Sequence, residues 1–403
     1  MSETETVDPQ LQNFILSETQ KQRFQYNTCN MFSRIGNFLQ RHRRKFLVTG
    51  AVLGSVYFVM TYAQKKLREL QEKETKKFFE MTRKKQHFET TERTCNQTIL
   101  SLSKIVSDNI LTILNTEEII QKLAENPENK LALWDQLKVM IFTRISVLVY
   151  ALSILQVTLR VQLNIIGGYL YRDSVHEDAH FVDSDLQTKY LSLCHHFIGP
   201  GIEDLVRQIE KTVKRVVEPI SLKNKITLQE VEQVFWSIQT ILCTDTSAGD
   251  PVKKLVHYLV DHADVRNEAK FDTVVNETMD LLESHEVTSV TTSIVSRSFS
   301  SVVDEIANLF VSKWDPPSKK HLEISEDHVV TKLALKLDRS NQFEDVNKIE
   351  MHFIKLLPAI NDLITKNTCE SNTNIPDLLT QQLTLNEKLK LLGANIYEVF
   401  SDA

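Results

Sequence analysis

An H-E-x-x-H motif is the clearest sign of chemistry in this 403-residue chain; it consists of His176, Glu177 and His180. On a helix, two histidines four residues apart share one face and can ligate zinc, while the glutamate acts as the general base of a protease. Glu203 could supply a third ligand. The motif, however, follows Gly167-Gly168, which predicts a helix end, and it lies among aspartates. An exposed loop lacks the packed second shell that fixes metal-binding imidazoles, so a membrane-anchored zinc protease is only a remote alternative.

The other candidates for catalysis are weaker. His195-His196 has no carboxylate at a useful spacing, and Cys194 beside it would point to a different face of its helix. The five cysteines are far apart, without C-x-x-C or Cys/His spacing, so neither a disulfide framework nor a zinc finger is predicted. The chain also has no glycine-rich phosphate loop, no G-x-S-x-G and no G-x-G-x-x-G. We therefore expect no enzyme, no resident metal and no cofactor.

Glycine and proline are scarce, with nine of each in the whole chain. That is roughly 2% apiece, against typical usage near 7% and 5%. Sheets, barrels and sandwiches need frequent turns, and turns need these residues. An all-α protein with few, long helices is the fold class that remains. The net charge of −6 is close to balanced and does not indicate a nucleic-acid-binding protein.

The elements that would position a site begin with an apolar segment near the N-terminus. Residues 46–63 read FLVTGAVLGSVYFVMTYA, eighteen residues without a charge. As a helix this segment spans about 27 Å, enough for the hydrocarbon core of a bilayer. Basic residues flank both ends and the following residues carry no signal-peptide cleavage pattern. We predict a single transmembrane anchor, with a buried helix as the alternative, and a large cytosolic region, 64–403, because dispersed cysteines suit a reducing compartment.

The anchor separates two polar regions. Residues 1–45 lack hydrophobic periodicity and end in a basic flank, so we expect a disordered N-terminal extension there. Residues 64–86 form a basic stalk, in which nine basic and four acidic side chains lie between positions 65 and 85. Such a helix is attracted to anionic lipid head groups, although a stalk kept soluble by its charges explains the pattern as well. The side chains predicted to face lipid are Lys65, Lys66, Arg68, Lys76, Lys77, Lys84 and Lys85.

Downstream of the stalk, apolar residues recur at helical spacing. A long helix is predicted over 131–166, apolar on every side at its centre and ended by Gly167-Gly168. A second membrane span is the alternative, but Arg144 and Arg160 leave only fifteen residues between charges, too few to span comfortably. No long linker divides the region, so one large helical bundle is expected. Its further predicted helices are 117–125, 186–198, 202–217, 227–243, 251–263, 271–284, 287–313, 343–366 and 376–400.

A helical bundle without catalytic residues is suited to binding, because apolar grooves between helices accept partner helices through a few aromatic or aliphatic anchors. Trp134 is the strongest candidate anchor, since it lies near the start of the long helix beside Leu123, Leu131 and Leu133. The alternative is that Trp134 belongs to the core.

Several strings of the sequence, in a fixed order and spacing, resemble the peroxin-3 (peroxisomal biogenesis factor 3) family. The resemblance runs from Met31 onward and is weakest between about 245 and 345. The strings that carry it are RHRRKFLVTGAVLGSVYF (41–58), AQKKLRELQE (63–72), HFETTERTCNQTILSL (87–102), NKLALWDQLKVMIFTR (129–144), RVQLNIIGGYLY (160–171) and GANIYEVFS (393–401).

The resemblance implies a peroxisomal membrane protein with a single span and a cytosolic helical bundle. In that family the bundle is the docking receptor for peroxin-19, the cytosolic chaperone that carries newly made peroxisomal membrane proteins. The chaperone's amphipathic N-terminal helix lies in an apolar groove, and the matching positions here are Leu123, Lys130, Trp134 and Lys355. An alternative that the family also suggests is a surface tether for organelle inheritance or turnover factors. The segment before Met31 departs from the family's usual start.

Overall fold

The structure is a computed structural model, and the chain divides into two compact units, residues 1–83 and 84–403. The residues that it describes are 43–125, 127–175, 180–244, 249–259, 269–312, 349–365 and 374–402. The predicted all-α class is confirmed. Within the described residues the strands are two residues long, β1 (Lys225–Ile226) and β2 (Met351–His352), and they pair antiparallel.

In the first unit the described chain is a single helix. It is the N-terminal part of α2 (Arg43–Ile113), which continues into the second unit and includes the whole predicted anchor, 46–63. Its apolar side chains between Val56 and Tyr62 are 57–72% exposed. A run of exposed apolar side chains on a helix is what a bilayer would cover. The transmembrane role of this segment stays a prediction.

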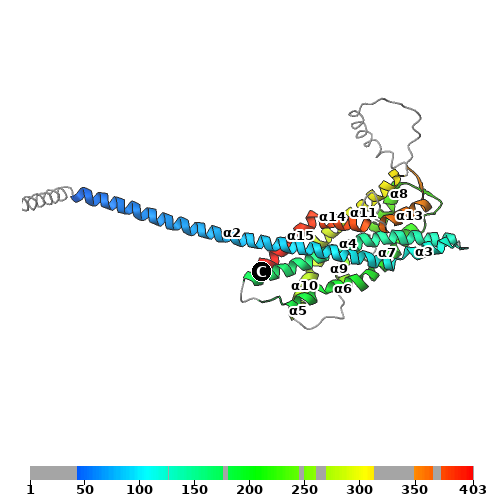
Figure 1. Cartoon of the computed structure of the whole chain (residues 1–403), viewed down its shortest axis with the longest axis horizontal. Coiled ribbons are helices and arrows are strands. Elements are labelled where there is room, and N and C mark those ends of the chain that lie inside the picture. Colours follow the sequence, from blue (N-terminus) through cyan, green and yellow to red (C-terminus); the bar gives the residue numbers. More distant parts are fainter. Residues whose placement is uncertain are drawn as a thin grey trace, which may run out of the picture. The chain divides into compact units, whose positions relative to one another are not determined.

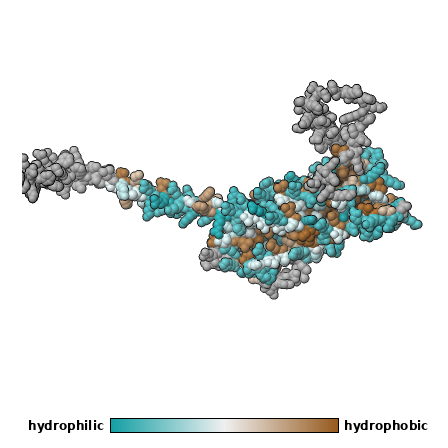
Figure 2. Space-filling view, in the orientation of Figure 1, coloured by the Kyte–Doolittle hydropathy of each residue, from teal (hydrophilic) through white to brown (hydrophobic). Residues whose placement is uncertain are grey.

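The second unit is built around α4 (Lys130–Val175), which is buried on all sides along most of its length (Figure 1). Among the described helices, α4 is the one that is long and apolar enough to cross a membrane. However, 94% of its most apolar 18-residue stretch is buried inside the bundle. It is therefore the core helix of the bundle. The helices packed on it include α3 (Thr116–Ala124), α7 (Ile202–Val217), α10 (Ala269–Glu283), α11 (His285–Ser312), α13 (Phe353–Thr365), α14 (Ile375–Thr384) and α15 (Glu387–Asp402). On the face shown in Figure 2, hydrophilic side chains cover much of the second unit, with apolar patches between them.

The predicted end of the central helix is wrong, because α4 continues through Gly167-Gly168 to Val175. The two glycines serve close packing. A Cβ added to Gly167 would lie 2.7 Å from Thr91 Cγ2, and one added to Gly168 would lie 2.6 Å from the Cβ of Phe400. Because glycine has no side chain, α2 and α15 can approach the α4 backbone closely at these two positions.

Other helix boundaries also differ from the prediction. The segment expected as one helix at 376–400 is two, α14 and α15, because the Asn386 side chain accepts a hydrogen bond from the backbone N–H of Lys388 and starts a new helix. The helix expected at 343–366 begins only at Phe353, and residues 343–348 lie outside the described residues. The remaining described elements are α5 (Ser184–Leu191), α6 (Leu193–His196), a π-helical turn (Phe197–Gly201), α8 (Leu228–Thr244), a 3₁₀ turn (Pro251–Lys254) and α9 (Leu255–Leu259).

Candidate partner-binding surface

The predicted site lies at the end of the second unit where α3 and the start of α4 meet (Figure 1). The helix α3 begins at this point because the Asn115 side chain accepts a hydrogen bond from the Glu117 N–H, 3.1 Å away. Acidic residues in its first turn and Lys122 in its last complement the helix dipole. In the last turn Leu123 is half-buried and packs against the core.

The first turns of α4 present an apolar ridge next to Leu123. Trp134 is half-buried and packs against the core, whereas Leu131 is 61% exposed. Residues three apart share a face of a helix, so Leu131 extends the surface of Trp134 toward solvent. Lys130, the first residue of α4, is exposed at the edge of this ridge. A side chain held by the core on one side and reachable on the other is suited to anchor a partner helix.

Arg144 ties together the helices that carry this ridge. Its guanidinium donates to Thr116 Oγ1 on α3 (2.6 Å), to Asn361 Oδ1 on α13 (2.9 Å) and to the carbonyl of Leu111 on α2 (3.2 Å). The residue is only 2% exposed, and burial lowers the pKa of its guanidinium to about 10. All three acceptors are uncharged, so the guanidinium acts here through the fixed directions of its donors and not through an ion pair. It thereby joins α2, α3, α4 and α13 at one point.

A second buried cation holds the other flank of α4. The Lys138 ammonium donates to the carbonyls of Glu218 (3.3 Å) and Ile220 (2.7 Å), just after α7 ends. It also pairs with Asp135 at 3.0 Å, and its side chain is fully buried. Since an ammonium has three donors, these partners satisfy it.

Lys355 reaches the same end of the unit through α13. This helix starts directly after β2, where the Phe353 N–H donates to the carbonyl of Asn224, 3.0 Å away. The ring of Phe353 lies 6.0 Å from the ring of Phe142 on α4. Lys355, two residues further on, is exposed.

The structure thus brings Leu123, Lys130 and Trp134 onto two adjacent helices and places Lys355 on a third helix that packs on α4. Within the described residues, no hydrogen bond or ion pair joins these four side chains. Sequence reasoning named Leu131 only as a neighbour, although its i,i+3 spacing from Trp134 was a usable signal. The clamping roles of Arg144 and Lys138 could not be found, because their partners are distant in sequence.

The basic stalk residues differ from one another in environment. Lys65, Arg68, Lys76, Lys77 and Lys85 are exposed, and Lys66 is an exposed partner of Glu69 at 3.7 Å. Lys84 belongs to the second unit, where its ammonium lies 2.5 Å from a carboxylate oxygen of Asp402 on α15. The positive charge of Lys84 is therefore partly neutralised by Asp402 within the second unit.

The H-E-x-x-H motif falls mainly outside the described residues, which include neither His176 nor Glu177. His180 is described and exposed, and its carbonyl accepts a hydrogen bond from Lys270 Nζ, 3.1 Å away. The zinc hypothesis therefore stays a prediction from the sequence.

The second unit is a large all-α bundle that carries an apolar ridge, edged by lysines, at one end. These features define a class of helical proteins that are suited to bind a partner helix. The chain belongs to the peroxin-3 family, whose model matches residues 37–132, 123–181 and 171–398. It is 33% identical over 389 residues to peroxisomal biogenesis factor 3 of Rattus norvegicus, covering 92% of this chain and 98% of that protein. The human protein of the same name is 32% identical with the same coverage. Peroxisome biogenesis protein 3-2 of Arabidopsis thaliana is 25% identical over 67% of this chain and 79% of its own length.

Proposed function

We propose that this chain serves peroxisome biogenesis as a membrane docking receptor for the chaperone peroxin-19. The relatives named as peroxisomal biogenesis factors support the peroxisomal role. The observation that carries the docking role is the pairing of half-buried Trp134 with exposed Leu131 on one face of α4. Tryptophan in such a position is typical of the residues that dominate a binding interface.

The geometry suggests how the chaperone's amphipathic N-terminal helix is held. Its apolar face buries against Leu123, Leu131 and Trp134. The aliphatic stems of Lys130 and Lys355 cover the edges while their ammonium groups stay in water. Because Arg144 fixes α3, α4 and α13, the surface is preorganised, and little ordering entropy is lost on binding.

Docking of the chaperone brings its membrane-protein cargo to the peroxisomal membrane. The anchor at 46–63 holds the receptor there, with the bulk of the chain facing the cytosol. The exposed stalk residues Lys76 and Lys77 attract anionic head groups and help cargo meet lipid. Neutralising the stalk lysines at 76, 77, 84 and 85 should lower cargo insertion, and unchanged insertion would remove lipid contact from the mechanism.

Calorimetric titration tests the docking role. The full chain in detergent micelles is titrated with the N-terminal helix of peroxin-19, and the titration is repeated with Trp134→Ala. We expect the variant to lose about 2 kcal/mol or more, roughly thirtyfold in affinity. Trp236→Ala is the matched control, because Trp236 is 59% exposed on α8, a helix that carries none of the ridge residues, and its removal should leave binding unchanged.

Two results would contradict this proposal. Binding that survives Trp134→Ala would move the groove elsewhere on the bundle. A folded wild-type chain that does not bind the helix would leave the family's tethering role as the better account, since tether partners need not use Trp134.

A further inference from the structure

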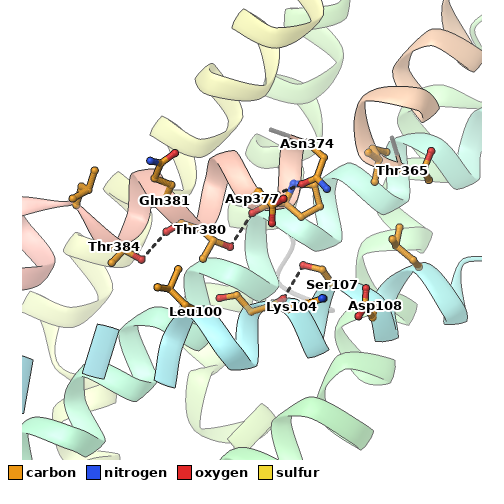
Figure 3. Close-up of a pocket in the computed structure, with 15 residues that line it drawn as sticks. Leu100, Lys104, Ser107, Asp108, Thr365, Asn374, Asp377, Thr380, Gln381 and Thr384 are labelled. Atoms are coloured by element: carbon orange, nitrogen blue, oxygen red, sulfur yellow. Dashed lines mark hydrogen bonds between the residues drawn. The ribbon is translucent and has the colours of Figure 1, made fainter. Parts of the chain in front are cut away.

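Two hollows on the bundle differ in the side chains around them. The one shown in Figure 3 lies between α2 and α14, and its lining mixes donors and acceptors of both charges, among them Lys104 and Asp377. Its described lining therefore selects no single kind of occupant. The other hollow lies between α8 and α11 and has a cavity volume of about 430 Å³. None of the ridge residues near Trp134 lines it, so it is a separate feature of the surface.

The groove between α8 and α11 combines an aromatic floor with an exposed tryptophan. Phe235 and Phe299 are 1% and 4% exposed, and their ring centroids lie 5.7 Å apart. Trp236 lines the same groove and is 59% exposed. A tryptophan ring left in water beside an apolar groove is typical of a protein–protein interface.

The two helices run in opposite directions along this groove. Gln239 of α8 donates to Ser296 Oγ of α11, 2.5 Å away. One turn back in α8, Phe235 meets Phe299, which lies one turn further on in α11. Glu232 lies another turn back in α8 and also lines the groove. This exposed carboxylate is therefore near the part of α11 that follows Phe299.

The charges on the exposed face of α11 have opposite signs at its two ends. Arg297 and Asp304 are exposed, and neither makes an ion pair within the described part of the chain. Because seven residues are almost two full turns, the two side chains share one face, about 10 Å apart along the axis. Lys388 of α15 donates to Ser293, 3.1 Å away and one turn before Arg297. It adds positive charge at that end, while Glu232 adds negative charge at the end of Asp304.

A face with this charge pattern is complementary to a second copy of itself. In a two-fold dimer the same surface meets from both sides, so that residue i of one copy contacts residue j of the other and the reverse. An axis near Ser300, midway between the charges, brings Arg297 of each copy to Asp304 of the other. Ser300 is small and exposed, and its hydroxyl already donates to the carbonyl of Ser296, 3.2 Å away. Two helices can therefore approach at this point without leaving a donor unpaired.

We propose that the face formed by α8 and α11 pairs two copies of the chain as a symmetric dimer. The two Arg297–Asp304 contacts set the antiparallel direction of the helices. Trp236 is covered between the copies, because it lines the same groove as Ser300. The match of this face with its own reverse favours a second copy over a partner of unrelated sequence. The inference does not depend on the proposed chaperone site, because the two surfaces share no residue.

Charge reversal tests the dimer in the full chain in detergent micelles. Two batches of the chain carry a donor or an acceptor fluorophore at the C-terminus, and energy transfer on mixing measures their association. Arg297→Glu sets glutamate against Asp304, and Asp304→Arg sets arginine against arginine. Each variant should therefore associate with itself about tenfold or more weakly than the wild type does. A mixture of the two variants regains both opposite-charge contacts, so its energy transfer should return to the level of the wild type.

Matched reversals on other helices are the controls. Lys211→Glu on α7 and Asp280→Arg on α10 change exposed side chains, and each variant should associate with itself like the wild type. Trp236→Ala should weaken association by about tenfold or more. Trp134→Ala should leave it unchanged, which distinguishes this surface from the chaperone site.

Three results would each overturn the proposal. The first is a wild-type chain that stays monomeric, which would assign the exposed tryptophan to a partner of different sequence. The second is a single charge reversal that associates with itself as strongly as the wild type does. The third is a mixture of Arg297→Glu and Asp304→Arg chains that shows no more energy transfer than either variant alone.

Discussion

Replacing Arg144 tests how the candidate surface is held together. Arg144→Met removes three hydrogen bonds from a charged donor and leaves the carbonyl of Leu111 without that partner. Thr116 and Asn361 keep their mutual hydrogen bond of 3.1 Å. Burying an unpaired carbonyl costs about 1–3 kcal/mol, while removal of a buried cation is favourable. We expect a net loss of about 2 kcal/mol in the free energy of unfolding.

Arg144→Lys should be worse than Arg144→Met, although it conserves the charge. The ammonium keeps the desolvation cost, yet its single nitrogen cannot reach acceptors on three helices at once, so we expect a loss of about 3 kcal/mol. Unfolding entropy near 2.1 cal/mol/K per residue, applied to the unit at 84–403, gives about 0.7 kcal/mol/K. The two losses then correspond to melting temperatures lower by about 3 °C and 4–5 °C.

Thermal unfolding of the full chain in detergent micelles, followed by far-UV circular dichroism, measures these shifts. Arg207→Met is the control, because the Arg207 side chain is 72% exposed on α7 and its loss should change the melting temperature by less than about 1 °C. The reasoning is refuted if the lysine variant melts like the wild type while the methionine variant does not. Positive charge alone would then stabilise the junction, and the shape of the guanidinium would not matter.

Two further predictions concern packing and reactivity. Gly168→Ala should lower the melting temperature by about 2–4 °C, since its Cβ would clash with Phe400 at a cost of about 1–3 kcal/mol. Gly199 has open space around it, so the control Gly199→Ala should leave the melting temperature unchanged. Equal shifts for the two variants would contradict the packing role of Gly168. Burial raises the pKa of the Cys95 thiol to about 12, so iodoacetamide should alkylate half-buried Cys243 before Cys95 in the folded chain. Mass spectrometry that finds Cys95 modified at the same rate would show that α2 separates from α4 in solution.

Most of the fold could be predicted from the sequence, because scarce glycine and proline exclude sheets and helical periodicity is local. The helix at 202–217 was predicted with the bounds that α7 has. The end of α4 could not be predicted, since a Gly-Gly pair has the same appearance whether it ends a helix or admits a neighbour. Only the approach of Phe400, more than two hundred residues away, decides between these roles.

The candidate site, like the fold, could be predicted from the sequence only in part. Trp134 was recognisable from its residue type and its place at the start of a helix. The exposure of Leu131 and the clamp at Arg144 depend on tertiary contacts with α3 and α13. Arg144 was visible in the sequence only as a charge that argued against a membrane span. That inference was correct, although the physical use of the charge was hidden.

The composition of α4 also has a consequence during synthesis. Before the bundle closes, a growing chain presents this helix as a second stretch apolar enough for a bilayer, after the segment at 46–63. Its partner α15 begins at Glu387, whereas α4 ends at Val175. At about 5–20 residues per second, this separation of 212 residues, 387 minus 175, leaves α4 incompletely covered for on the order of 10–40 s. The nascent chain must be shielded from mistaken insertion into a bilayer over that interval.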